Sequence, residues 1–417
     1  ESIKQILALR YSTNLETSFQ KLVPEDFETK QIINPENIIE QSIRKSISTE
    51  LDSNSKKIGI SLSSGIDSTL VLALLRKEFP STDIESISVK FSESTDETDV
   101  SKKISKKFHT NHHILEIDNF LEELPKAISI VKQPFWDLHW YYLVKKMKSL
   151  TNVFLSGDGG DELFGGYPSF QLIPKLRKTW LKTIPKAFMK WGIALSKSLF
   201  SLNQAIKLEH WVQGKWSGAH EYFLIRALFC QDQVLNLFAD RERAQTEIEK
   251  DYQRTQRLIA KCPANDLFNQ ISYLETFHYL QNMLLRDVDM MSMAHPLEVR
   301  VPFMDHRLVE VMFRLPGKEK NSGVAKSLLT SSMKSLLPES VQRRKKMGFT
   351  FPFEIWMRGA LRSEIEPVLL SSMKQLDGLL SKNSVEKVWN DFLARKISWS
   401  RPWALYVLKS WINKNLS

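Results

Sequence analysis

The fold is decided by the stretch Lys56-Lys57-Ile58-Gly59-Ile60-Ser61-Leu62-Ser63-Ser64-Gly65-Ile66-Asp67-Ser68. Ile58, Ile60 and Leu62 alternate as in a buried strand, and apolar residues then recur at helical spacing from Ile66 to Leu75. The Ser/Gly turn between them lets the backbone approach a ligand, and a helix start offers N–H groups and a favourable dipole to an anion. This stretch therefore predicts a strand, a phosphate-binding turn and a helix.

Asp67 is the unexpected residue of this turn, because a carboxylate repels phosphate unless a cation lies between them. We therefore expect a Mg²⁺ ion that bridges Asp67 and a nucleotide. The turn has neither the Gly-Lys-Ser/Thr ending of a Walker loop nor the three-glycine spacing of a dinucleotide-binding fingerprint. Taken alone, it is equally explained as a common strand-to-helix connection that binds nothing.

A second glycine-rich loop, Asn152–Phe170, follows another short apolar strand and carries five glycines and three carboxylates. Ligands of an open parallel sheet lie at the carboxyl ends of its strands, so the two loops should meet at one crevice. Carboxylates this close together repel each other without a cation, and we expect Asp67 and Asp161 to share one Mg²⁺ ion.

The pairing of Ser63–Ser68 with Ser156–Tyr167 resembles the synthetase domain of the asparagine synthetase family, which is of the PP-loop ATP pyrophosphatase type. Two later segments agree with that family, Leu285–Asp305 and Arg344–Phe349. The resemblance implies an AMP-forming carbon–nitrogen ligase that uses ATP and Mg²⁺. Such an enzyme adenylates a carboxylate, releases pyrophosphate and lets ammonia attack to form an amide.

By motif position, the resemblance implies that Lys346 contacts the reaction centre and that Asp158 positions the amino substrate or removes its proton. Asp161 would complete the metal site begun by Asp67. The residues implied to bind the nucleotide come from both loops and the second strand: Leu62, Ser63, Gly65, Asp67, Ser68, Val89, Ser156 and Gly157. Leu62 and Val89 are equally explained as core residues of their strands.

Aspartate is the acceptor that the resemblance favours, with asparagine as the product. The segment Lys132–Trp140 departs from the family pattern, since Gln133, His139 and Trp140 replace an acidic residue and a small hydroxyl residue. Two alternatives therefore stay open. One is a related adenylating synthetase of the β-lactam or macrolactam type, and the other is a non-catalytic, synthetase-like docking protein.

Signals for strands and helices alternate up to about residue 170, after which helical spacing prevails. This order predicts an α/β fold, a doubly wound and mostly parallel sheet followed by a helical subdomain. The resemblance implies the adenine nucleotide alpha hydrolase-like version of it. We expect an extension at 1–45 that resembles the end of a glutaminase domain, an ATP-binding domain at 46–170, and a helical part at 171–417 that carries Lys346.

The two cysteines bear on both compartment and nitrogen source. Cys230 and Cys262 lie far apart without metal-type spacing, which favours a reduced, cytoplasmic protein without a zinc site or disulfides. No cysteine precedes Cys230, so the N-terminal cysteine nucleophile of the family's glutaminase domain is not expected in this chain. Ammonia would then be taken up directly or supplied by a separate glutaminase subunit, and a homodimer stays open.

Composition excludes some classes of protein. The chain has 417 residues, 42% of them hydrophobic, with no apolar run as long as a membrane span and no secretory signal at its start. A net charge of +10 gathers partly in the lysine-rich segment Pro174–Trp216, which has a single acidic residue, Glu209. We expect a solvated helix face there, with a docking surface as the alternative; nucleic acid is not expected, because RNA-binding signatures are missing.

Overall fold

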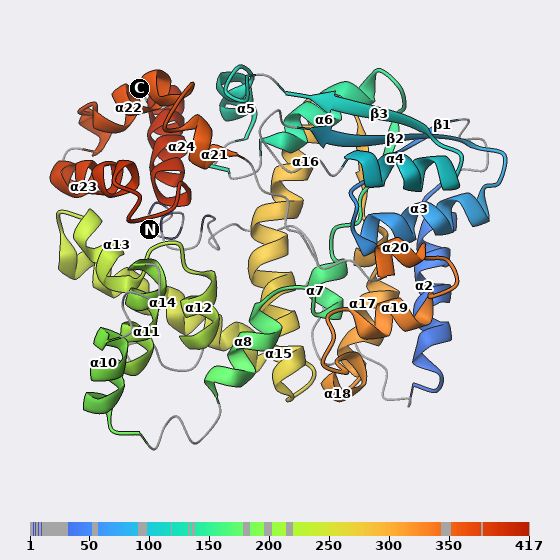
Figure 1. The fold of residues 1–417 in the computed structure, drawn as a ribbon, viewed down its shortest axis with the longest axis horizontal. Helices are drawn as coiled ribbons and strands as arrows, with labels where there is room; N and C mark the ends of the chain where they lie inside the picture. Colours follow the sequence, from blue (N-terminus) through green and yellow to red (C-terminus); the bar gives the residue numbers. More distant parts are fainter. Residues whose placement is uncertain are drawn as a thin grey trace.

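The structure is a computed structural model that describes residues 3, 5, 7, 10, 32–51, 57–90, 98–117, 119–131, 134–135, 138–177, 184–195, 202–213, 220–342, 352–376 and 378–416. Figure 1 shows a sheet with its covering helices on one side and a group of helices on the other, with a long helical column between them.

Among the described residues, the sheet has five strands in the order β3-β2-β1-β4-β5, and neighbouring strands pair in parallel. They are β1 (Lys57–Ser61), β2 (Asp83–Lys90), β3 (Asn111–Glu116), β4 (Val153–Leu155) and β5 (Glu298–Arg300). The α/β fold with a parallel sheet is thereby confirmed. Because β1 and β4 are neighbours, the loops that follow them leave the same edge of the sheet side by side.

Both faces of the sheet are covered, as the doubly wound prediction requires. Ile58 and Ile60 point from β1 into a core shared with α3 (Ile66–Glu78) and α2 (Pro35–Glu50). Gly59 faces the other way, where an added Cβ would lie 2.6 Å from Met147 Cε of α6 (His139–Lys148). Glycine at this position lets α6 pack directly against the strand.

Helices make up most of the remaining chain. Between the strands and in the second loop lie α4 (Thr98–Lys107), α5 (Leu124–Ile130) and α7 (Gly160–Phe164). The helices that follow are α8 (Ser169–Leu176), α10 (Lys186–Leu195), α11 (Leu202–Gln213), α12 (His220–Arg226), α13 (Gln231–Leu237) and α14 (Arg241–Ala260). The column in Figure 1 is continuous: α15 (Leu267–Leu274), the π-helix η3 (Glu275–Leu284) and α16 (Leu285–Met293).

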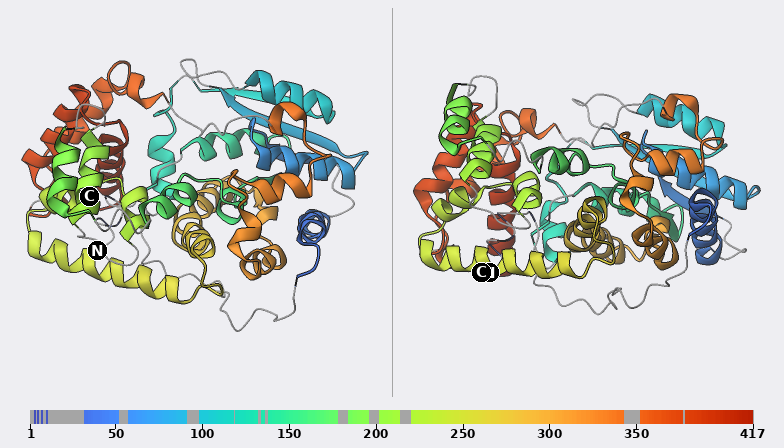
Figure 2. Two further views of the ribbon diagram at one scale, coloured as in Figure 1. Left: turned by 60° about the horizontal axis from the view of Figure 1, so that its bottom comes forward. Right: turned by 90° about the horizontal axis from the view of Figure 1, so that it is seen from below.

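After the column the chain returns to the sheet and then leaves it again. The returning elements are the 3₁₀ turn η4 (Pro302–Met304), α17 (His306–Arg314), α18 (Gly317–Lys320), α19 (Ser327–Ser332) and α20 (Glu339–Gln342). The last group comprises α21 (Phe353–Trp356), α22 (Arg362–Leu370), the 3₁₀ turn η5 (Lys374–Leu376), α23 (Lys382–Leu393) and α24 (Ser400–Asn415). In both views of Figure 2, α14 runs from the group of peripheral helices toward the column.

Strand β5 corrects one expectation from the sequence, that the second half of the chain is all helical. Its residues pair with β4 in the register Val153↔Glu298, Phe154↔Val299 and Leu155↔Arg300. Three residues are too few to show an alternating pattern, and they extend because β4 supplies their hydrogen-bond partners. The division of the chain near residue 170 stays a prediction.

Two further findings concern membrane-spanning helices and the state of the two cysteines. Within the described ranges, no helix combines the length and the hydropathy needed to cross a lipid bilayer. Cys230 and Cys262 are both buried as thiols, and burial raises the pKa of each above its ordinary value.

Candidate active site

A cavity of about 1020 Å³ opens at the carboxyl ends of β1, β2 and β4. Its walls come from the turn after β1, from the end of β2, from the loop after β4, and from the returning segment Ser322–Gln342. The two loops singled out in the sequence therefore meet at one crevice. The returning segment was not expected there.

The turn after β1 is held in shape by its own hydroxyls. Ser63 Oγ lies 2.9 Å from Ser68 Oγ and accepts a hydrogen bond from the backbone N–H of Gly65 at 3.1 Å. Gly65 is the N-cap of α3 and supplies no side chain to the first N–H groups of that helix. The helix start thus faces the cavity as a site for an anion, with Ser63 and Ser68 fixed beside it.

Leu62 and Val89 differ in how deeply their side chains are buried. Leu62 is 1% exposed with its side chain in the core, and its carbonyl accepts a hydrogen bond from Ser88 Oγ. Val89 is half-buried and lines the cavity. Leu62 can therefore meet a ligand only through its backbone, whereas Val89 packs against the core and also lines the cavity.

Glycines explain how closely the second loop approaches the first. A Cβ on Gly157 would lie 2.8 Å from the backbone nitrogen of Ser68, and one on Gly160 would lie 2.3 Å from Asp67 Oδ1. Larger residues at either position would push the loops apart. The close spacing of the two loops thus requires glycine, which has no side chain, at positions 157 and 160.

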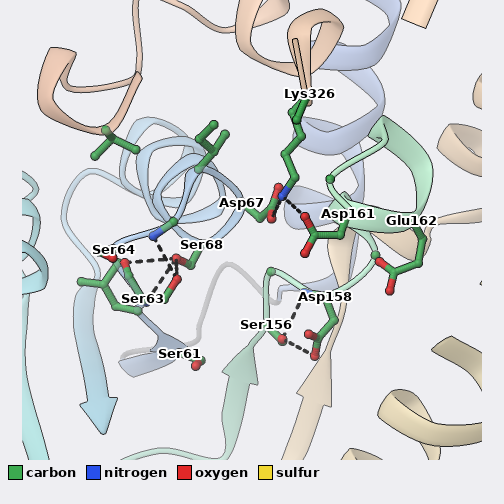
Figure 3. Close-up of a pocket in the computed structure, with 18 of the residues that line it drawn as sticks. Ser61, Ser63, Ser64, Asp67, Ser68, Ser156, Asp158, Asp161, Glu162 and Lys326 are labelled. Atoms are coloured by element: carbon green, nitrogen blue, oxygen red, sulfur yellow. Dashed lines mark hydrogen bonds and ion pairs between the residues drawn. The ribbon is translucent and has the colours of Figure 1, made fainter. Parts of the chain in front are cut away.

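Asp67 and Asp161 face one cation, the ammonium group of Lys326 (Figure 3). Lys326 Nζ pairs with Asp67 Oδ2 and lies 2.5 Å from Asp161 Oδ1. Burial alone would lower the pKa of Lys326, but the two carboxylates outweigh burial and raise the pKa well above its ordinary value. The sequence predicted a Mg²⁺ ion between these carboxylates, which stays a prediction, and it did not single out the lysine that lies there.

The backbone holds Lys326 in place. Its φ of 58° is left-handed, it is the N-cap of α19, and its N–H donates to the carbonyl of Phe164 at 3.1 Å. Gly166 makes room for the contact, since a Cβ there would lie 1.8 Å from Asp161 Oδ1 and 2.6 Å from Lys326 Cε. The only sequence signal that could have led to Lys326 was the need for a counter-charge.

The same two carboxylates fit a metal ion that a nucleotide helps to bind. Across the described residues, no group of three or more His, Cys, Asp or Glu side chains could hold a metal by itself. Mg²⁺ takes about six oxygen ligands and commonly uses one or two carboxylates, completing its shell with phosphate oxygens and water. Asp67 and Asp161 supply what such a bridging ion needs from the protein.

Two further carboxyl groups of the second loop have raised pKa values. Asp158 accepts a hydrogen bond from Ser156 Oγ at 2.8 Å, and burial, followed by the charges of Asp161 and Asp67, raises its pKa to about 6. Glu162, 1% exposed, accepts a hydrogen bond from Tyr167 at 2.7 Å, and burial raises its pKa to about 8. Glu162 had no assigned role, although it stands in the same motif.

Other sequence predictions fall partly outside the described residues. Lys346 lies outside the described residues, in the range 343–351. Gln133 and most of residues 1–45 also lie outside them. His139 and Trp140 both line the cavity, and burial lowers the pKa of His139 to about 3. Two of the residues that depart from the family pattern thus lie at the site itself.

Comparisons with known proteins agree with the resemblance. A family model described as asparagine synthase matches residues 39–413. A glutamine-hydrolyzing asparagine synthetase of Bacillus subtilis is 27% identical over 376 residues, which cover 86% of this chain and 56% of that protein. A second one from B. subtilis is 28% identical over 295 residues, covering 67% and 42%.

The chain therefore spans about half the length of the curated relatives it matches. Among solved structures, an NH3-dependent NAD synthetase from Campylobacter jejuni is 14% identical and covers 43% of this chain and 94% of its own. The TM-score of the two structures is 0.24.

Proposed function

The chain belongs to the asparagine synthase family, and from this premise we propose that it is an ATP-dependent amide-forming synthetase. Its substrates would be the side-chain carboxylate of L-aspartate and ammonia, and its products asparagine, AMP and pyrophosphate. The observation that carries the proposal is the meeting of Asp67 and Asp161 at one cation beside the start of α3, in a cavity large enough for a nucleotide.

The turn after β1 would bind the phosphates. Ser63, Gly65 and Ser68 line the cavity at the N-terminus of α3, where backbone N–H groups and the helix dipole favour negative charge. The negative charge that grows on departing pyrophosphate would be stabilised at the same place. Asp67 and Asp161 would hold Mg²⁺, which when bound neutralises charge on the phosphates.

The adenosine would lie against the ends of β1, β2 and β4. Leu62 would contribute its backbone and Val89 its side chain, while Ser156 and Gly157 would contribute from the start of the second loop. Ser156 Oγ already donates to Asp158, so its hydroxyl also sets the orientation of that carboxylate.

Asp158 would act on the attacking nitrogen. With a pKa of about 6, its carboxyl group is mostly ionised at pH 7, so that it can position ammonium and accept its proton before attack on the adenylate. Lys346 would contact the α-phosphate, where a compact positive charge stabilises the transition state. The support for Lys346 comes from its motif position.

The experiment is a pyrophosphate-release assay with Mg-ATP over a panel of carboxylates, with ammonium and with glutamine as nitrogen sources. Aspartate-dependent pyrophosphate with ammonium supports the proposal, and Lys346→Ala should abolish turnover while leaving ATP binding nearly intact. No aspartate-dependent release at any ammonium concentration would refute aspartate as the acceptor. Release with another carboxylate would identify a related adenylating synthetase.

The same assay bears on partners. If glutamine supports no reaction until a separate glutaminase is added, the chain depends on an ammonia-supplying subunit. Sedimentation at the assay concentration would separate a monomer from a homodimer.

A further inference from the structure

We propose that the ammonium group of Lys326 is a resident counter-ion of the metal site, one that Mg²⁺ displaces only when it enters together with a nucleotide. The inference rests on the proposed function, because it assumes that Asp67 and Asp161 hold the metal of an ATP-binding site. It adds the order in which the cations occupy that site and names the residue that enforces the order.

The geometry makes the two cations mutually exclusive. Lys326 Nζ contacts Asp67 Oδ2 and lies 2.5 Å from Asp161 Oδ1, so it occupies the point between the two carboxylates. A Mg²⁺ ion held by both side chains would need the same carboxylate oxygens that the ammonium group contacts. The metal cannot enter while the ammonium group stays, and the ammonium group cannot stay beside a divalent cation.

Lys326 is built to occupy this position. Its side chain is 7% exposed, its backbone N–H is anchored to the carbonyl of Phe164, and Gly166 leaves the room that its Cε needs. Phe164 and Gly166 belong to the loop that also carries Asp161. The lysine and one of its carboxylates are therefore positioned by the same short segment.

Lys326 also has somewhere to go. It lies on the wall of the cavity, and its side chain has four rotatable bonds with which to swing toward the space that phosphates would fill. Without a nucleotide, that movement would take the ammonium group away from both carboxylates and give it nothing in return. With a nucleotide present, phosphate oxygens give it a new partner and give the metal its missing ligands.

The consequence is a coupling between metal and nucleotide. The protein without a nucleotide should bind divalent ions weakly, and the nucleotide should raise that affinity strongly. By linkage, the metal raises nucleotide affinity by the same factor. Part of this coupling should disappear when the ammonium group is removed.

The test is Mn²⁺ binding followed by electron paramagnetic resonance on the full chain, with and without α,β-methylene-ATP, which binds without reacting. Lys326→Met keeps an unbranched side chain, one atom shorter than that of lysine, and removes its charge. The matched control is Lys334→Met, because Lys334 also lines the cavity but is exposed. No ion pair to Lys334 is found in the part of the chain that the structure describes.

Without nucleotide, Lys326→Met should bind Mn²⁺ about tenfold or more tightly than wild type, and Lys334→Met within about twofold of wild type. The analogue should raise wild-type affinity by about 100-fold and that of Lys326→Met by clearly less. Equal Mn²⁺ affinity for wild type and Lys326→Met would overturn the inference. If Lys326→Met does not fold, an unchanged wild-type affinity on adding the analogue would overturn it as well.

Asp67→Asn separates this inference from the proposed function. Loss of Mn²⁺ binding in Asp67→Asn, with no gain in Lys326→Met, would leave the metal site in place and remove the exchange. Exchange without pyrophosphate release from any tested carboxylate would keep the inference and remove the synthetase. Mn²⁺ binding that Asp67→Asn leaves unchanged would move the metal elsewhere and overturn the exchange.

Discussion

Lys320 and Lys326 stand six residues apart on the segment that returns to the sheet, and both are buried, at 1% and 6% exposure. Lys326 contacts two carboxylates at the cavity. Lys320 lies under α15 and α17 and donates to neutral oxygens, Asn269 Oδ1 and the carbonyl of Met312. Burial lowers the pKa of Lys320 to about 7, whereas the pKa of Lys326 is raised.

The difference shows what keeps charge on a buried lysine. Around Lys320 the nearest surroundings are neutral: the rings of Phe268 and Phe313 have their centres 5.4 and 5.7 Å from its ammonium nitrogen. The charge of Asp266 only partly offsets burial there. A buried lysine in this segment thus keeps its proton firmly where carboxylates lie in direct contact with it. Lys326 at the cavity has such contacts, and Lys320 does not.

The largest expected effect comes from removing a carboxylate at the cavity. Asp67→Ala should lower pyrophosphate release by about 1000-fold or more, or about 4 kcal/mol in the activation barrier. Under the proposed function this variant would lose one of the two carboxylates that hold Mg²⁺, and Lys326 would keep only Asp161 as a partner. The measurement is steady-state pyrophosphate release at saturating Mg-ATP.

The matched control removes the acid near the other lysine. Asp266 is the N-cap of α15 and accepts a hydrogen bond from the backbone N–H of Asn269 at 3.0 Å. Asp266→Ala should cost about 1 kcal/mol of stability and change pyrophosphate release much less than Asp67→Ala does. Equal losses of activity in the two variants would contradict the contrast.

The next effect concerns the charge of Lys320. Its folded pKa of about 7 lies below the ordinary 10.5, so between these values the unfolded chain binds a proton that the folded chain does not. Its contribution to stability is therefore full above pH 10.5 and is lost as pH falls toward 7, by about 1.4 kcal/mol per unit. Lys320→Met should lack that slope in urea unfolding between pH 7.5 and about 9.5, a difference of roughly 3 kcal/mol.

Lys318 provides the comparison variant for this slope, because it is exposed two residues earlier on the same helix. Lys318→Met should keep the wild-type dependence on pH. If Lys320→Met also keeps it, the ammonium group of Lys320 is not neutralised by burial.

A smaller effect is expected from crowding the contact at Lys326. Gly166→Ala places a Cβ 1.8 Å from Asp161 Oδ1, so the carboxylate and the lysine must shift apart. We expect a loss of about 1–3 kcal/mol in the free energy of unfolding, measured by urea titration. Gly192→Ala is the control, since its Cβ would meet nothing within 4 Å and a helical alanine should slightly stabilise α10.

The smallest effect extends the comparison to a carboxylate. The pKa of Asp158 is raised from 3.8 to about 6, so the folded state takes up a proton first as pH falls. Its favourable contribution is complete below pH 3.8 and is lost as pH rises through about 6. After allowing for water in the cavity, Asp158→Asn should flatten the stability profile in this window by about 1–2 kcal/mol.

The control for Asp158→Asn is Asp99→Asn, whose side chain is 74% exposed. It should leave the profile of thermal unfolding against pH unchanged. A profile that Asp158→Asn leaves unchanged as well would mean that burial does not govern the charge of Asp158.

The sequence could predict those features that depend on neighbouring residues or on general rules. Ile58 and Ile60 alternate, and Gly65 ends the turn, so β1 and α3 could be assigned from neighbouring residues alone. The meeting of Asp67 with Asp161 follows from a topological rule for parallel sheets. A shared cation follows from elementary electrostatics.

What the sequence could not predict depends on contacts made over long distances along the chain. Lys326 carries no local mark that separates it from Lys318 or Lys334, because only the return of the chain brings it to the carboxylates. The raised pKa values of Asp158 and Glu162 depend on burial that no periodicity shows. Residue type indicated the chemistry, and the path of the chain decided which lysine took part.

Strand β5 has a consequence for how the protein can be made. Val153 of β4 pairs with Glu298 of β5, which is synthesised 145 residues later. The edge of β4 therefore stays uncovered until β5 has been made. Until then a nascent or truncated chain presents an open strand edge, which favours aggregation. A fragment that ends near residue 170 would therefore be prone to aggregate and would lack Lys326. The two halves of the chain would have to be expressed together to cover β4 and to assemble the site.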